Sequence, residues 1–189
     1  GTAVTTATHN TLIGATAGDA LTSGGSNTVL GRDALSADTL GSRAVAIGEA
    51  ALQAQNFTTA TDSFNTAVGF EALATNSTGV QNVAVGDYVL DANTTAHYNT
   101  GLGSQALSGN TTGASNVAVG HRSLLVNTTA ADNTGVGASS LAANTTGASN
   151  TGLGSGALAS NTTASNNVAV GKSALLLNTT GGYNIAVGK

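Results

Sequence analysis

The chain has 189 residues, of which 7% are charged and 3% aromatic, and its net charge is −4. Typical soluble domains carry about 25% charged residues, and five Lys and Arg residues cannot form the basic stripe of a nucleic-acid-binding surface. No apolar run approaches the roughly 20 residues that a membrane-spanning helix needs, and the lack of Cys excludes disulfides and Cys-ligated zinc.

The first part of the chain follows the later repeat only weakly. A unit that begins at Asn10 keeps a glycine at Gly14 but carries its leucine at Leu21, and residues 1–9 fit no unit. We therefore expect an irregular capping coil over residues 1–26. Residues 27–64 hold two degenerate units, beginning at Asn27 and Ala44, and the second has four extra residues. These extra residues predict an insertion at 56–64.

From Asn65 onward the chain repeats at constant spacing as N-[TVI]-[AG]-[VL]-G-x-x-[ASV]-L-x-x-N-[ST]-T-[GA]-x-x, with later units beginning at Asn82, Asn99, Asn116, Asn133, Asn150, Asn167 and Asn184. Helical hairpin repeats need about 33 residues or more, and a unit this short can bury apolar surface only by stacking on its neighbours. We predict an all-β fold, a parallel β-solenoid (β-roll) of about eleven 17-residue coils, with residues 65–189 as its regular part. A helix over Ala-Leu stretches such as 71–74 is the alternative, which the dense Gly, Asn and Thr disfavour.

The fixed apolar positions predict a core and a corner. Alternation of large and small residues before each glycine is typical of a strand, and we expect the two large residues to point inward. The glycine predicts a corner with positive φ or no room for a side chain. The predicted core residues are Leu73, Leu90, Leu107, Leu124, Leu141, Leu158, Leu175, Val68, Val85 and Val119. The predicted turn glycines are Gly69, Gly86, Gly103, Gly120, Gly137, Gly154 and Gly171.

The Asn-Thr-Thr triplet recurs once per coil and predicts a second corner. Asn tolerates turn geometry, and identical Asn side chains stacked at strand spacing can form amide ladders. The same triplet matches the N-glycosylation sequence, which leaves glycosylation open as an alternative. The candidate acceptors would be Asn93, Asn110, Asn127, Asn144, Asn161 and Asn178.

Catalytic groups are sparse in this sequence. The three histidines lie in different coil contexts, and the carboxylates are scattered in the regular region, where no coil holds more than two. Nucleophilic catalysis needs an oriented base, and glycoside hydrolysis needs two facing carboxyl groups. We therefore expect no enzymatic activity, no cofactor and no metal site.

The repeated Asn-Val-Ala-Val-Gly segment resembles the head repeats of trimeric autotransporter adhesins, and the longer unit resembles repeats of phage tail fibres. The resemblance covers residues 27–189. It implies a left-handed β-roll that forms a homotrimer. It also implies that the small residue in the middle of each strand lies at the subunit contact. These residues are Ala67, Ala84, Gly101, Ala118, Gly135, Gly152, Ala169 and Ala186.

These features favour a structural rod of an extracellular, cell-surface or virion-surface fibre, whose partner is the chain itself. Open β-edges at solenoid ends invite pairing, so a head-to-tail filament is one predicted assembly. The alternative is an adhesive head that recognises a host-surface glycan or protein, and an ice-binding solenoid is a weaker one. The candidate ligand patch comprises Phe70, Tyr88, His97, Tyr98, His121 and Arg122.

Overall fold

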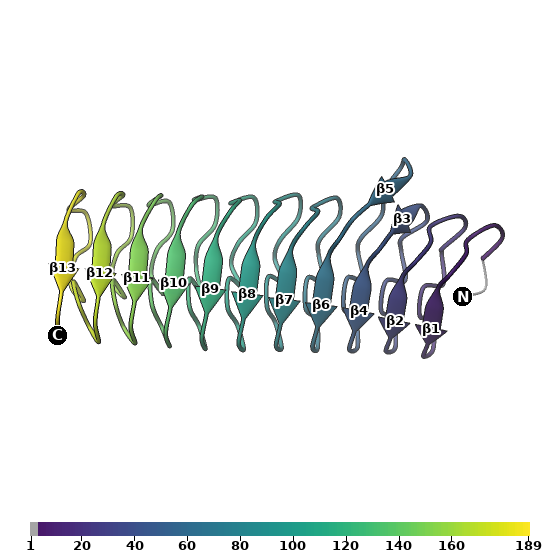
Figure 1. Ribbon diagram of the computed structural model, residues 1–189, viewed down its shortest axis with the longest axis horizontal. Coiled ribbons are helices and arrows are strands. Elements are labelled where there is room, and N and C mark those ends of the chain that lie inside the picture. Colours follow the sequence, from purple (N-terminus) through teal and green to yellow (C-terminus); the bar gives the residue numbers. More distant parts are fainter. Residues whose placement is uncertain (1–3) are drawn as a thin grey trace.

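The computed structural model describes residues 4–189, a parallel β-solenoid of about ten to eleven turns without a helix in that range (Figure 1). Residues 1–3 of the expected capping coil lie outside this description. The strands are β1 (Thr11–Ile13), β2 (Thr28–Leu30), β3 (Gly41–Ser42), β4 (Val45–Ile47), β5 (Thr61–Asp62), β6 (Thr66–Val68), β7 (Val83–Val85), β8 (Thr100–Leu102), β9 (Val117–Val119), β10 (Thr134–Val136), β11 (Thr151–Leu153), β12 (Val168–Val170) and β13 (Ile185–Val187).

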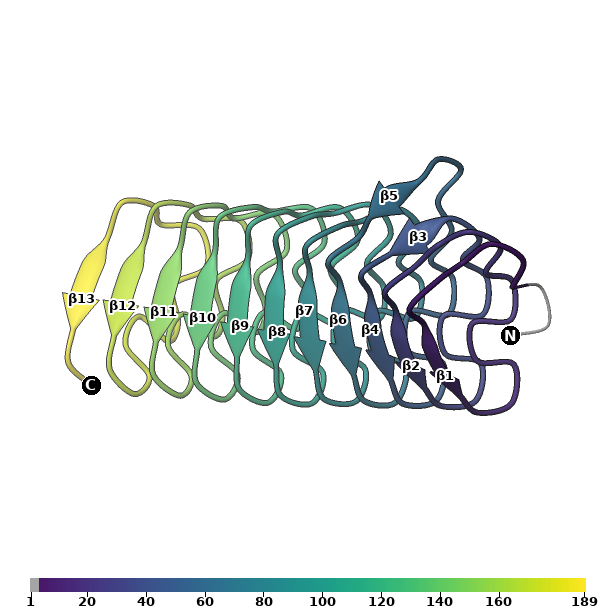
Figure 2. The same cartoon turned by 45° about the vertical axis from the view of Figure 1, so that its right-hand side comes forward.

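Eleven of the strands form one parallel sheet, in which each coil supplies one strand in chain order. Partners in the regular part are separated by one sequence repeat, as Ala84 opposite Gly101 and Gly101 opposite Ala118 show. The strands lie side by side along the whole rod (Figure 1). In the turned view their tilt changes steadily from β1 to β13 (Figure 2), as expected for the twist of neighbouring strands.

The four extra residues leave the coil stacking intact. Val45 of β4 pairs with Thr66 of β6, so the pairing simply skips the inserted residues and keeps its register. The insertion leads into β5, which pairs with β3 and projects from the rod near its N-terminal end (Figures 1 and 2). Arg43 holds this projection, because its Nε lies 3.1 Å from Asp62 Oδ1 and its guanidinium lies over the Phe64 ring.

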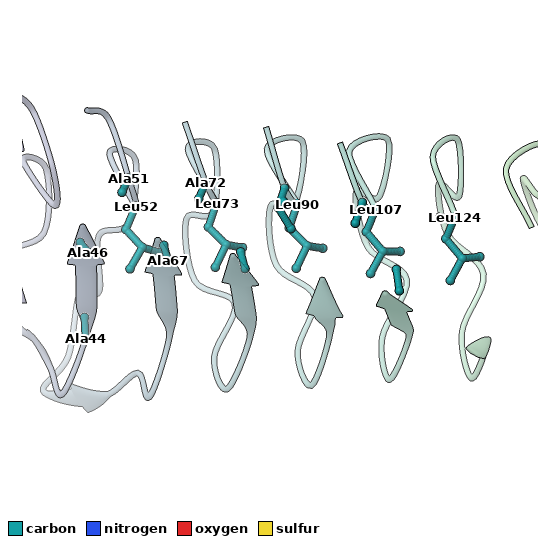
Figure 3. Packing of buried hydrophobic residues seen from close by; sticks show 14 of the residues in the cluster. Ala44, Ala46, Ala51, Leu52, Ala67, Ala72, Leu73, Leu90, Leu107 and Leu124 are labelled. Atoms are coloured by element: carbon teal, nitrogen blue, oxygen red, sulfur yellow. The ribbon is translucent and has the colours of Figure 1, made fainter. Parts of the chain in front are cut away.

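The predicted leucine column fills the interior of the solenoid. Six of the seven predicted leucines are fully buried, and Leu175 packs against the same cluster while partly exposed. Figure 3 shows Leu52, Leu73, Leu90, Leu107 and Leu124 in a single row. Each fully buried leucine contributes about 1.5–3 kcal/mol, so this column is the main apolar contribution to the stacking of coils.

The predicted direction of the strand side chains is wrong. Val68 and Val119 are half-buried and Val85 is 38% exposed, whereas the central Ala67, Ala84 and the equivalent residues are fully buried. The interior of the regular coils is too narrow for two large residues, because the leucine of the opposite wall already occupies it. The central position therefore points inward and is restricted to small residues there, while the flanking residues face outward.

The size of the central strand residue, from β7 onward, depends on the coil before it. Where the residue twelve positions earlier is Ala, the central residue is Ala, as in the pair Ala72 and Ala84. Where it is larger, the central residue is Gly: a Cβ on Gly101 would lie 2.5 Å from Val89 Cγ1, and one on Gly135 would lie 2.6 Å from Ser123 Oγ. The central strand residue of one coil and the residue twelve positions earlier, in the coil before it, therefore occupy one small volume in common.

Gly101→Ala is expected to lower the free energy of unfolding by about 1–3 kcal/mol, the usual cost of overpacking a core. Adding Val89→Ala should recover part of the loss, because it recreates the Ala–Ala pair of the coil before it. Chemical denaturation of the two single variants and the double variant measures the coupling, expected at about 1 kcal/mol or more. Strictly additive effects would contradict the shared volume.

The segment between each corner glycine and the turn asparagine is a chain of tight turns and not a helix. In the coil of β6, Ala72 N donates to Gly69 O and Ala74 N to Glu71 O, three residues back in each case. Alternate residues have positive φ, 53° at both Glu71 and Leu73. The intervening amides bond to the next coil, as Leu73 N does to Val89 O at 3.0 Å. The helical alternative is therefore excluded for this segment.

The first complete coil keeps the fold despite its divergent sequence. β1 pairs with β2 in the common register, although Gly18 stands where later coils have leucine. A Cβ on Gly18 would meet the Leu12 side chain at 2.7 Å, so Leu12 reaches from the strand into that space. Leu21 stands where later coils have the turn asparagine and is fully buried. The coil thus replaces polar interior contacts with apolar ones.

Candidate interaction surfaces

The described part of the chain, residues 4–189, is a solid rod in which no pocket opens at the surface or inside. It holds no cluster of three His, Asp or Glu residues that could bind a metal ion. Nor does this range include a helix of sufficient length and hydropathy to span a bilayer. The surfaces that a partner could contact are the outer faces of the solenoid and the open sheet edges at β1 and β13.

Two columns of buried asparagines run along the interior. We call those just before the strands the strand asparagines (Asn27, Asn65, Asn82, Asn99, Asn116, Asn133, Asn150 and Asn167) and those of the triplets the turn asparagines (Asn76, Asn93, Asn110, Asn127, Asn144 and Asn161). In one coil, Asn82 and Asn93 both donate to the Ala96 carbonyl, at 2.8 and 3.2 Å. The two columns thus hold the loop between them closed.

The asparagines also bond coil to coil, always in the same direction. Turn asparagine Asn93 donates from Nδ2 to Asn76 Oδ1 at 2.8 Å, and Asn127 does the same to Asn110 at 2.9 Å. Each strand asparagine accepts from a backbone N–H in the next coil, as Asn82 Oδ1 does from Asn99 N at 2.9 Å. These bonds satisfy buried amides that would otherwise be costly to desolvate.

Toward the N-terminus the turn column changes its chemistry. Gln55 and Asp38 occupy the positions equivalent to the turn asparagines, and both are fully buried. Asp38 accepts bonds from Gln55 Nε2 at 2.7 Å, from Gly41 N at 3.0 Å and from Phe57 N at 3.3 Å. A carboxylate fits here because all three neighbours that point at it are donors.

Burial also bears on the glycosylation alternative. Asn93, Asn110, Asn127, Asn144 and Asn161 are fully buried and hydrogen-bonded in the ladder, whereas Asn178, in the last triplet, is half-buried. A glycan on a ladder amide would have to displace its interior bonds. The folded chain therefore does not present these five side chains to a modifying enzyme, and the ladder accounts for the triplet.

The candidate ligand patch is divided between two edges of the rod. Phe70 and Tyr88 follow their strands and form an edge-to-face ring pair with centroids 5.2 Å apart. His121 and Arg122 hold equivalent positions two coils further on and are exposed. His97 and Tyr98 precede their strand and thus lie at the opposite edge, where His97 Nδ1 accepts from Val80 N at 2.9 Å. The structure does not bring the six residues together.

The outward sheet face was not foreseen as an interaction surface. It consists of the first and third residues of the eleven long-sheet strands. The third residue of each of these strands is aliphatic: Ile13, Leu30, Ile47, Val68, Val85, Leu102, Val119, Val136, Leu153, Val170 and Val187. The resemblance implied that the central strand residues lie at a subunit contact, but the structure buries them inside the chain itself. The buried residues are Ala67, Ala84, Gly101, Ala118, Gly135, Gly152 and Ala169, and Ala186 is half-buried in the last coil.

One buried polar atom has no hydrogen-bond partner. Among residues 4–189, Asp91 Oδ1 is the one buried side-chain oxygen or nitrogen that lacks such a bond. Burial raises the pKa of this carboxyl, and a hydrogen bond from Ser108 opposes the shift. A raised pKa means that the folded state favours the protonated form. The stability that Asp91 contributes is therefore complete below its unfolded pKa and is lost as the pH rises through the folded pKa.

Asp91→Asn is accordingly expected to raise the free energy of unfolding at pH 7 by up to about 1 kcal/mol, since it removes a poorly solvated charge. The difference from the wild type should shrink as the pH falls through the raised pKa of the folded carboxyl, and it should be small below the unfolded pKa of about 3.9. Urea denaturation at several pH values measures it. Asp132→Asn, at an exposed edge position, controls for the loss of one charge, and an equal gain there would contradict the burial argument.

Comparison of the chain with protein-family models, with curated proteins and with solved structures found no match in any of the three.

Proposed function

We propose that the chain is a non-catalytic structural rod of an extracellular or virion-surface fibre. The observation that supports the proposal most is the unbroken bonding from coil to coil. The backbone ladder, the leucine column and two asparagine columns all run along the same axis. Such an assembly resists bending because any kink would break several of these columns at once.

The dimensions and surface agree with this role. Ten spacings of about 4.8 Å between eleven strands give a rod on the order of 50 Å long. Residues 133–171 contain no charged residue, so long stretches of the surface are uniform. A spacer needs stiffness and length, and the stacked coils supply both.

Immunogold labelling of the cells or particles that produce the chain tests the proposal. Gold particles along surface filaments or virion fibres are the expected result, and labelling confined to the cell interior would overturn it. Small-angle X-ray scattering of the purified chain adds a test of shape, for which a rod profile is expected and a compact sphere is not.

A second candidate, an adhesive surface, is favoured by one observation. Phe70 and Tyr88 are exposed by 38% and 37% and stack edge to face. Beside them Ser104 Oγ donates to Asp87 Oδ2 at 3.0 Å. Exposed aromatic rings next to polar groups can pack on a sugar ring while the polar groups bond its hydroxyls.

Binding to a glycan array tests this second candidate. Tyr88→Ala should abolish the binding if the ring pair is the contact, and Tyr98→Ala, at the opposite edge, is the matched control. Equal binding by the wild type and Tyr88→Ala, or no binding by the wild type, would reject the candidate.

A further inference from the structure

One hydrogen bond between neighbouring coils depends on a titratable side chain. His97 Nδ1 accepts from the backbone N–H of Val80, in the coil before it, with the two nitrogens 2.9 Å apart. The imidazole is half-buried, and its ring centroid lies 6.0 Å from that of Tyr98. A backbone N–H can only donate, so this bond requires an unprotonated Nδ1 and a neutral ring that carries its proton on Nε2.

The equivalent position in other coils, three residues before the strand, shows what the histidine replaces. Ser42 and Ser165 hold this position in two of them, and their hydroxyl oxygens accept from Gly25 N and Ala148 N, both at 3.0 Å. A serine hydroxyl keeps its acceptor oxygen throughout the physiological pH range, whereas histidine ordinarily changes its charge between pH 5 and 8. Of these three contacts, the one with histidine can therefore lose its acceptor by protonation.

We propose that His97 forms a pH-sensitive latch with Val80, closed when the imidazole is neutral and open when it is protonated. Protonation places an N–H at Nδ1, opposite the Val80 N–H, so two donors face each other and the ring must turn away. The bond is therefore present above the range near pH 6.5 in which histidines ordinarily titrate, and it is lost as the pH falls through that range. This latch does not depend on the proposed rod function.

The surroundings of the imidazole on this edge of the rod hold no adjacent charge. Tyr98 is the titratable neighbour on its own coil. The two adjacent coils place uncharged residues at the equivalent positions: Val80, Gln81, Ala114 and Ser115. Asp62 and Asp132 lie about two coil spacings away, roughly 10 Å, and Arg43 lies one spacing further. The Debye length at physiological ionic strength is about 8 Å, so these charges are largely screened.

Opening of the latch is local, because other bonds hold the same two coils together. Tyr98 N donates to Val80 O at 3.3 Å, and the strand asparagines continue their ladder across this junction. Val80 also lies beside the base of the projection that carries β5, since its neighbour Gln81 donates from N to Ser63 O at 2.8 Å. Acid therefore loosens the edge where the projection meets the regular coils and leaves the rod folded.

Residue-resolved amide exchange of the full chain between pH 8 and pH 5, corrected for the intrinsic pH dependence of exchange, tests the proposal. The protection factor of the Val80 amide should fall about fivefold on acidification, the factor that corresponds to one hydrogen bond of about 1 kcal/mol. The Ala148 amide, which donates to Ser165, is the internal control and should keep its protection. Nitrogen-15 spectra of the imidazole should place the proton of His97 on Nε2 at pH 8.

Two substitutions separate the latch from a purely structural role, and other coils already carry both residues at this position, as Ser165 and Ala131. His97→Ser should keep the Val80 bond and abolish its pH dependence, whereas His97→Ala should leave Val80 unprotected at every pH. His121→Ser, which removes an exposed histidine from the opposite edge, should respond as the wild type does. The proposal is refuted if Val80 protection in the wild type does not change with pH, if it changes equally in His97→Ser, or if Nδ1 carries the proton at pH 8.

Discussion

Gly120→Ala is expected to lower the free energy of unfolding by about 4 kcal/mol, one of the two largest single-residue effects we predict. Gly120 has a φ of 125°, and a Cβ there would lie 2.7 Å from the carbonyl carbon of Gly137 in the next coil. Strained backbone conformations cost about 1–3 kcal/mol, and an overpacked contact adds about as much. Urea denaturation followed by circular dichroism measures the loss.

Gly188→Ala separates the two causes. Gly188 has almost the same φ, 132°, but a Cβ there would meet nothing within 4 Å. Its substitution should therefore cost only the conformational strain, about 1–3 kcal/mol. If both variants lose the same stability, the close approach of successive coils contributes nothing and the corner requires glycine for its φ alone.

Asn127→Asp is expected to be at least as damaging, by about 4 kcal/mol or more at pH 7. The Asn127 amide donates to Asn110 Oδ1 and to Ala130 O, both at 2.9 Å, and its side chain is fully buried. Aspartate has nearly the same shape but would turn two attractive contacts into repulsions between oxygens. Burial should raise the pKa of the introduced carboxyl, so the loss should diminish as the pH falls.

Two comparisons control this experiment. Thr129→Asp adds the same charge on the exposed side of the same coil and should change stability by no more than about 0.5 kcal/mol. Asp38→Asn tests the reverse exchange: it should also destabilise, because one carboxylate oxygen that accepts from a neighbouring donor, such as Gln55 Nε2, becomes an amide nitrogen. A tolerated Asn127→Asp would show that the ladder direction is not energetically important.

The repeat itself made the main features of the fold predictable. So short a period allows only stacked short strands, and a leucine, a glycine and two asparagines at fixed spacing imply columns. The leucine column is buried, and the predicted corner glycines have φ between 112° and 137°. The insertion was also visible, because four extra residues interrupt an otherwise constant spacing.

The candidate interaction surfaces were much less predictable. Alternation in a three-residue strand indicates that neighbouring side chains face opposite ways, but it does not indicate which of them face inward. The sequence Val-Ala-Val fits a strand with its two Val side chains inward as well as one with its Ala side chain inward. The six residues of the candidate ligand patch do not lie together, for a related reason. Tyr88 and Tyr98 lie close in sequence, but one follows a strand and the other precedes the next, so they lie at different edges.

The sequence alone therefore determined the period, the parallel stacking and the residue types that form the interior columns, because these depend only on spacing along the chain. Only the tertiary structure decided the inward face of each strand, the positive φ at Leu73 and Glu71, and the exposure of an aliphatic sheet face. These depend on the width of the closed coil: in the regular coils the opposite wall already fills the interior with leucine, and space remains for just one small side chain from the strand.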